Sequence, residues 1–101
     1  GRDNARELLN GRDPGTWLLR TSESSPGMNV ISYVDAGHTI RNILVEPRLS
    51  QGETFVEAFH HLVLRMEAGY SMDAEGRDCV PATPLKDHAM NPVAMPGHGA
   101  R

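Results

Sequence analysis

Three turn signals constrain this chain more than any other feature, because two of them join consecutive apolar runs. The signals are rich in Pro, Gly, Asp and Ser, which tight turns favour, and they read "DPG" at 13–15, "SSPG" at 24–27 and "DAGH" at 35–38. The apolar runs that follow them, at 16–22, 29–34 and about 39–45, have the length of strands. Strands joined by tight turns pair antiparallel. We therefore predict a small antiparallel three-stranded sheet.

Two further segments show helical spacing. The first runs from Asp3 or Asn4 through Asn10 and is followed by a glycine. The second, "FVEAFHHLVLRMEAG" at 55–69, repeats apolar residues on one helical face and also ends at a glycine. Two amphipathic helices can cover the two faces of a small sheet. The expected fold class is α+β, a three-stranded antiparallel sheet flanked by two helices.

Length and composition indicate one small domain. The chain has 101 residues, of which 39% are hydrophobic, enough for a single modest core. After Tyr70 branched apolar residues become rare and Pro, Gly and Asp frequent. We expect a domain over 1–85 and a Pro/Gly-rich tail or linker over 86–101.

The charge and the cysteine count narrow the class of partner. The net charge of −3 does not favour nucleic acid or an acidic membrane. The chain has one cysteine, Cys79, and no apolar run near the length of a membrane span. We expect a soluble cytoplasmic protein without cofactor or metal.

Arg20 is the unusual residue of the first strand, because it ends an apolar run. In a strand Leu18, Arg20 and Ser22 share one face. An arginine among apolar strands is partly desolvated, and an unpaired buried charge is costly. The following turn offers Ser24, Ser25 and several backbone N–H groups, an arrangement suited to an anion, and Arg2 of the first helix could add a second positive group. An arginine fork matches a phosphate in bidentate geometry, so we predict an anion site here.

The same residues carry a resemblance. "GTWLLRTSES" resembles the signature strand and phosphate loop of SH2 domains, and the order helix, three strands, helix is the SH2 order. The match is closer to STAT-type SH2 domains, through "PGTWLLRTSESS" at 14–25, "VEP" at 45–47, "TFVEAF" at 54–59, and "GY" with "MDA" at 69–74. As in that type, no extra strands fit between the third strand and the second helix, where only "RLSQGE" stands.

The resemblance implies phosphotyrosine binding without enzymatic activity. Arg20 matches the arginine that grips the phosphate, Ser22 and Ser24 match neighbouring hydroxyls, Glu23 matches a loop position that gives its backbone N–H, and Arg2 matches the basic residue of the first helix. On the third strand, Asn42 or a neighbour falls near a position that is histidine in many SH2 domains. Leu44 falls at a position where some SH2 domains have lysine. The expected phosphotyrosine site is Arg20, Ser22, Glu23, Ser24, Arg2, Ser25 and Asn42, and we expect Ile43 and Leu44 to contact the rest of the peptide.

The implied partner is a tyrosine-phosphorylated protein or peptide. We expect binding in the cytoplasm, or in the nucleus if the domain belongs to a STAT-like transcription factor. STAT proteins dimerise through a phosphotyrosine downstream of the domain. No tyrosine follows Tyr70, so we expect this chain to be a monomer.

Three other readings stay open. Arg20 could end an edge strand and extend into water. The chain could be a degenerate SH2 scaffold in which Glu23 or Asp35 occupies Arg20. A small hydrolase using Cys79 and His88 is the least supported. The adjacent His60 and His61 point about 100° apart on a helix, and they are expected to be solvated rather than metal-binding.

Overall fold

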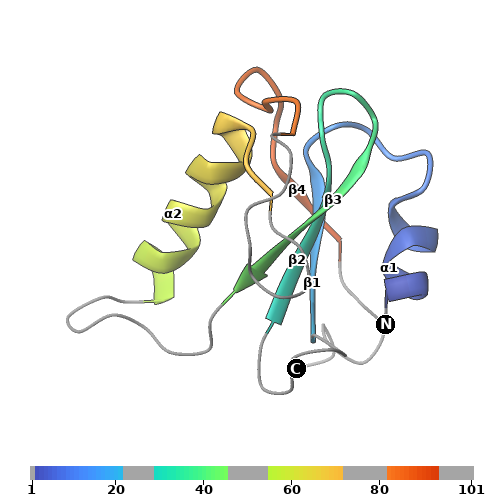
Figure 1. The fold of residues 1–101 in the computed structure, drawn as a ribbon, viewed down its shortest axis with the longest axis horizontal. Helices are drawn as coiled ribbons and strands as arrows, with labels where there is room; N and C mark the ends of the chain where they lie inside the picture. The colour runs from blue at the N-terminus through green and yellow to red at the C-terminus, as the bar shows by residue number, and fades with distance from the viewer. Residues whose placement is uncertain (1, 22–28, 46–54, 72–81, 94–101) are drawn as a thin grey trace.

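The computed structural model describes residues 2–21, 29–45, 55–71 and 82–93. Its elements follow the chain as α1 (Arg2–Leu9), β1 (Thr16–Thr21), β2 (Asn29–Val34), β3 (Ile40–Val45), α2 (Phe55–Ala68) and the short β4 (Asn91–Pro92) (Figure 1). The fold is therefore α+β, with a sheet and two helices in the predicted order.

The turn signals produce the predicted antiparallel pairing. β1 pairs with β2, and β2 with β3, both antiparallel. The register places Arg20 opposite Val30 and Ser32 opposite Asn42. Opposite residues of a ladder lie on the same face of the sheet, so Arg20, Ser32 and Asn42 share a face.

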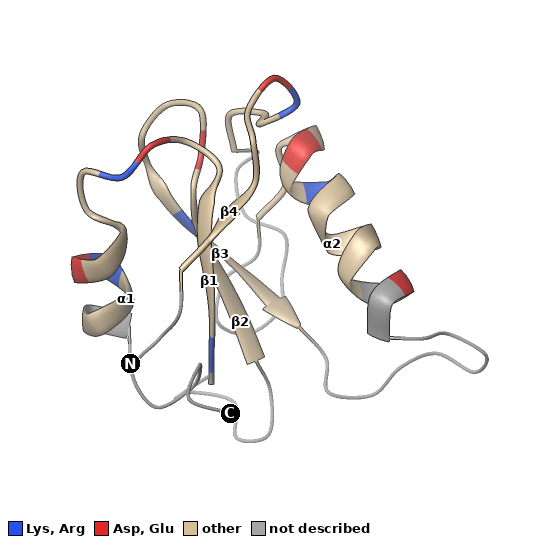
Figure 2. Cartoon of the chain, turned by 180° about the vertical axis from the view of Figure 1, so that it is seen from behind, with Lys and Arg blue, Asp and Glu red and all other residues tan. Residues whose placement is uncertain are grey.

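The two faces of the sheet are covered by different helices, α1 on one and α2 on the other (Figures 1 and 2). The buried residues on the α1 side are Ala5, Leu9, Leu18 and Val34. Those on the α2 side are Ile31, Tyr33, Ile43, Met66, Ala82 and Leu85, with Trp17 and Phe59 in tilted ring contact at 5.0 Å between centroids. The alternation predicted for the first strand is confirmed, because Leu18 packs on the α1 side and Trp17 on the α2 side.

Among the described residues the sheet has four strands, so the prediction of three was wrong. β4 lies beside β1 in parallel, giving the order β3-β2-β1-β4. The Asn91 N–H donates to the Gly15 carbonyl at 2.9 Å, and the Val93 N–H donates to the Trp17 carbonyl at 2.7 Å. Pro92 stands between these donors, at the position whose nitrogen faces away from β1. A proline is tolerated at such a position of an edge strand. A proline in the sequence nevertheless argues against a strand, so the pattern did not predict β4.

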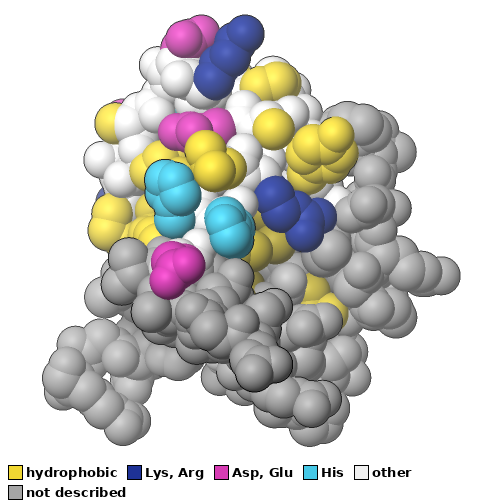
Figure 3. Space-filling model, turned by 90° about the vertical axis from the view of Figure 1, so that its left-hand side faces the viewer, with side chains coloured by type: hydrophobic (Ala, Val, Ile, Leu, Met, Phe, Trp, Pro, Cys, Tyr) yellow, Lys and Arg dark blue, Asp and Glu magenta, His cyan; other side chains and the backbone are white. Residues whose placement is uncertain are grey.

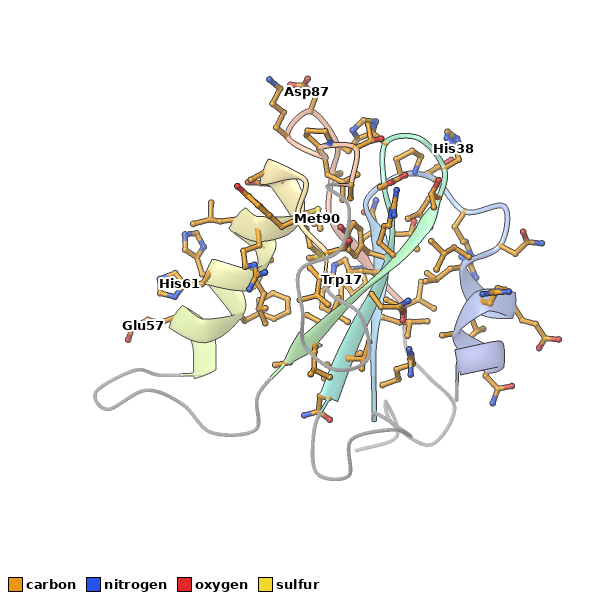
Figure 4. All side chains as sticks on the ribbon, viewed as in Figure 1. Trp17, His38, Glu57, His61, Asp87 and Met90 are labelled. Atoms are coloured by element: carbon orange, nitrogen blue, oxygen red, sulfur yellow. The ribbon has the colours of Figure 1, made fainter. Side chains whose placement is uncertain are left out.

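Residues 82–93 connect the end of α2 with the edge of β1 (Figure 1). Leu85 is completely buried in the α2-side core, and Met90 packs against that core. Figure 4 shows Met90 and Trp17 pointing inward, whereas Asp87 points away from the domain. Residues 86–93 were expected to belong to a tail, but their contacts make them part of the folded unit.

Gly15 marks the closest approach of residues 82–93 to β1. Its φ is +94°, a left-handed conformation, and a Cβ at this position would clash with the Ala89 carbonyl oxygen. Glycine is the residue that satisfies both conditions.

Candidate functional site

Arg20 is buried on the α1 side of the sheet. Arg20 is 4% exposed. It lies two positions after Leu18, near the C-terminal end of β1. A surface arginine that only extends into water would be far more exposed. The structure therefore disagrees with the reading of Arg20 as a solvated strand end.

Two side chains from the neighbouring strands hold the guanidinium. The Arg20 Nε–H donates to the Ser32 Oγ at 3.0 Å, and Nη2 donates to the Asn42 Oδ1 at 3.3 Å. The Ser32 hydroxyl in turn donates to the same Asn42 Oδ1 at 2.7 Å. β1, β2 and β3 thus contribute one residue each to a closed set of three hydrogen bonds, called here the Arg20–Ser32–Asn42 triad.

The direction of each bond in the triad follows from the groups involved. A guanidinium can only donate, so Ser32 Oγ and Asn42 Oδ1 must accept from Arg20. The serine proton is then directed to Asn42, and the asparagine oxygen faces the other two members. Both of these partners are neutral side chains.

Ser32 was missed by the sequence analysis, although Asn42 was included. The signal was present in "NVISYV", where Val30, Ser32 and Val34 share a face. A serine on a buried apolar face, 1% exposed here, needs a hydrogen-bond partner. Arg20 on the next strand was the nearest candidate.

Asp35 does not pair with Arg20. It lies at the opposite end of β2 and accepts hydrogen bonds from the backbone of Gly37 and Thr39 at 2.9 Å each and of Thr83 at 3.3 Å. The Arg41 Nε–H completes the set with an ion pair at 3.1 Å. Burial alone would raise the pKa of the Asp35 carboxyl, but these hydrogen bonds outweigh it and the pKa is lowered. Of the two carboxylates considered for Arg20, this one is engaged elsewhere, and Glu23 lies outside the described residues.

The remaining members of the expected phosphotyrosine site are only partly visible. Ser22, Glu23, Ser24 and Ser25 lie outside the described residues. Arg2 begins α1, the helix that covers the face carrying Arg20, and its side chain is also outside the description.

The two expected peptide contacts differ in environment. Ile43 is completely buried in the α2-side core, so it has no surface to offer a peptide in this structure. Leu44 lies opposite Val30 and is half-buried. Its ladder position places it on the same face as Arg20. Leu44 therefore remains a candidate contact, and Ile43 is better explained as core.

Tyr33 and Tyr70 are joined by a hydrogen bond beneath the end of α2. The Tyr33 hydroxyl donates to the Tyr70 carbonyl at 2.8 Å. Burial of Tyr33, followed by the charge of Asp35, raises the pKa of its hydroxyl to about 12. The Tyr70 side chain is 49% exposed.

The histidines considered for other chemistries lie on α2 and in residues 82–93, away from the strands that carry the triad. His60 and His61 are exposed on α2, where they form the histidine patch of Figure 3. His88 is exposed within residues 82–93, and Cys79 lies outside the described part. Within the described ranges no three His, Cys, Asp or Glu side chains gather as metal ligands. None of the described helices is long and apolar enough to cross a membrane.

Comparison with known proteins identifies the family. The family model described as the SH2 domain matches residues 1–72, which include Arg20, Ser32 and Asn42. The comparisons with curated proteins and with solved structures found no match. SH2 domains are in general phosphotyrosine-binding modules of signalling proteins and not enzymes. The match covers well over half of the chain, and this protein belongs to the SH2 domain family.

Proposed function

We propose that this domain binds tyrosine-phosphorylated peptides and that Arg20 is the group that binds the phosphate. The observation that carries the proposal is a buried guanidinium near the C-terminal end of β1, held by Ser32 and Asn42, in a chain of the SH2 domain family.

The orientation of the guanidinium supports a bidentate phosphate contact. Nε and Nη2 of Arg20 both bond within the sheet, along one edge of the planar group. We propose that a phosphate meets the guanidinium through two parallel hydrogen bonds, the geometry that arginine forms with phosphate. We propose that Ser22, Glu23, Ser24, Ser25 and Arg2 add further donors, since they follow β1 or begin α1.

We also propose the finer assignments suggested by the sequence. The STAT-type subtype is supported by "PGTWLLRTSESS" and by the short connection between β3 and α2. We further propose that the domain acts as a monomer, in the cytoplasm or nucleus, on a phosphorylated protein partner.

A degenerate SH2 scaffold without ligand is the alternative. It requires an internal anion at Arg20, and Asp35 does not serve as one because its hydrogen bonds lie at the other end of β2. Glu23 is the carboxylate left for this alternative.

Calorimetry with one peptide in two forms separates these functions. The peptide carries a single tyrosine flanked by alanines, with and without phosphate. The proposed function predicts binding of the phosphorylated form and no measurable binding of the other. Equal behaviour of the two peptides would favour the scaffold.

A further inference from the structure

We propose that Asn10 and Gly11 form a site of spontaneous modification, at which the asparagine loses its side-chain amide as ammonia while the domain stays folded. The products are aspartate and isoaspartate. The site lies on the connection between α1 and β1 (Figure 1), and it does not depend on phosphotyrosine binding. Of the five asparagines in the chain only Asn10 is followed by glycine, so the proposal concerns this position alone.

The reaction needs only these two residues and water. The backbone nitrogen of Gly11 forms a bond to Cγ of Asn10, and the bond from Cγ to the side-chain nitrogen breaks. That nitrogen leaves as ammonia with the proton of the Gly11 amide, and a cyclic imide remains. Water then opens the ring. Cleavage between the Gly11 nitrogen and Cγ gives aspartate, whereas cleavage between that nitrogen and the backbone carbonyl carbon of residue 10 gives isoaspartate.

The first argument is that the attacking amide is not engaged. The hydrogen bonds that close α1 come from the residues on either side of Gly11. The Asn10 N–H donates to the Arg6 carbonyl at 2.9 Å, and the Arg12 N–H donates to the Leu9 carbonyl at 3.1 Å. Within residues 2–21, 29–45, 55–71 and 82–93, no acceptor bonds to the Gly11 N–H. An amide bonded to a helix carbonyl would have to break that hydrogen bond before it could attack.

The end of α2 shows the contrast. Gly11 has a φ of +75° and Gly69 a φ of +88°, so each glycine follows its helix in the left-handed conformation. The Gly69 N–H, however, donates to the Met66 carbonyl at 3.2 Å. The same sequence signal, a glycine after a helix, therefore leads to a bonded amide after α2 and an available one after α1.

The second argument is access. Asn10 and Gly11 are both exposed, so the asparagine side chain can rotate and water can reach the imide. A Cβ built on Gly11 would meet no atom within 4 Å apart from its chain neighbours. The space around the Gly11 nitrogen is therefore open, and glycine adds no side chain that would hinder the approach of Cγ.

Isoaspartate at position 10 should disturb the end of α1. Its main chain runs through Cβ and Cγ and is one atom longer than that of asparagine. Arg12, two residues later, donates from its backbone to the Leu9 carbonyl and from Nε to the Leu8 carbonyl. Leu9 is 1% exposed and packs on the sheet. We expect the longer main chain to break the two Arg12 bonds and to loosen the packing of α1.

Thermal unfolding measures this effect. A sample aged at mildly alkaline pH until isoaspartate has formed should have a midpoint lower by about 4 °C or more, as expected for loss of hydrogen bonds in a domain of this size. A protein isoaspartyl methyltransferase, which methylates the isoaspartate carboxylate, reports how much has formed. Asn10→Gln is the matched variant, because it keeps the amide but requires a larger ring. After the same treatment it should accept no methyl group and keep its midpoint.

Peptide mapping by mass spectrometry tests the site itself. The protein is incubated in buffer and, in parallel, in urea, and conversion at each asparagine is followed. We expect Asn10 to convert in the folded protein within about fivefold of its rate in urea, the factor that one intact hydrogen bond on the amide would exceed. Asn91 is the internal control, because it is exposed but precedes Pro92, which has no N–H, and it should not convert by this route. Conversion of Asn10 in urea without conversion in the folded protein would overturn the proposal.

Discussion

The guanidinium of Arg20 bonds to Ser32, although the β ladder places Arg20 opposite Val30. The arginine side chain leans back along β1 and reaches the next residue pair of the same face, where Ser32 lies opposite Asn42. It therefore contacts two strands at once. A lysine ammonium could not reproduce these two bonds in one plane, so the site is specific for arginine.

The buried carboxylate of Asp35 should make the domain sensitive to acid. Its folded-state pKa is lowered from the ordinary value of 3.8, so its stabilising effect is complete above that value and is lost as the pH falls through the lower folded pKa. We expect the free energy of unfolding to decrease below about pH 4.

Asp35→Asn tests this acid sensitivity. The variant should have a free energy of unfolding about 1 to 3 kcal/mol lower than that of the unmodified protein at pH 7. At pH 2 the two free energies should be nearly equal. Urea unfolding followed by fluorescence of Trp17, the single tryptophan, measures both. If the difference in free energy of unfolding between the two proteins stays constant down to pH 2, another group dominates acid unfolding.

Tyr33 should make the domain sensitive to alkali. Its pKa is raised from 10.0 to about 12, so the neutral hydroxyl stabilises the fold fully below pH 10, and this effect is lost as the pH rises toward 12. The shift of the Tyr33 pKa corresponds to roughly 3 kcal/mol. Tyr33→Phe removes the hydrogen bond to the Tyr70 carbonyl, so its free energy of unfolding should be about 1 kcal/mol lower at neutral pH. Its free energy of unfolding should also fall less steeply as the pH rises. An equally steep alkaline decline in Tyr33→Phe would contradict the assignment.

The sequence predicted the parts of this fold that depend on local patterns. The antiparallel order followed from "SSPG" and "DAGH", and Arg20 was found because a charge ended an apolar run. β4 was missed because Pro92 breaks the strand pattern, and its pairing depends on a contact with Trp17 that is distant in sequence. Ser32 was missed because its role appears only when β1 and β2 are in register. Ile43 was expected to face a peptide, but α2 and residues 82–85 bury it.

Residues 82–93 should contribute to the stability of the whole domain. Leu85 is completely buried with Ile31, Tyr33, Ile43 and Met66, so Leu85→Ala should lower the free energy of unfolding by about 2 to 5 kcal/mol. Lys86→Ala, at an exposed neighbour, is the control and should change it by less than about 0.5 kcal/mol. A small effect of Leu85→Ala in urea unfolding would mean that residues 82–93 contribute little to the stability of the domain.

Phosphopeptide calorimetry on arginine variants tests the central claim most directly. Arg20→Ala should weaken binding of the alanine-flanked phosphotyrosine peptide by about 3 to 5 kcal/mol, or at least about a hundredfold, and Arg20→Lys should not restore it. Arg12→Ala is the control, because Arg12 is exposed and its guanidinium donates to the Leu8 carbonyl at the end of α1, and this variant should bind like the unmodified protein. Near-unchanged affinity in Arg20→Ala would contradict the assignment of Arg20 as the phosphate-binding residue.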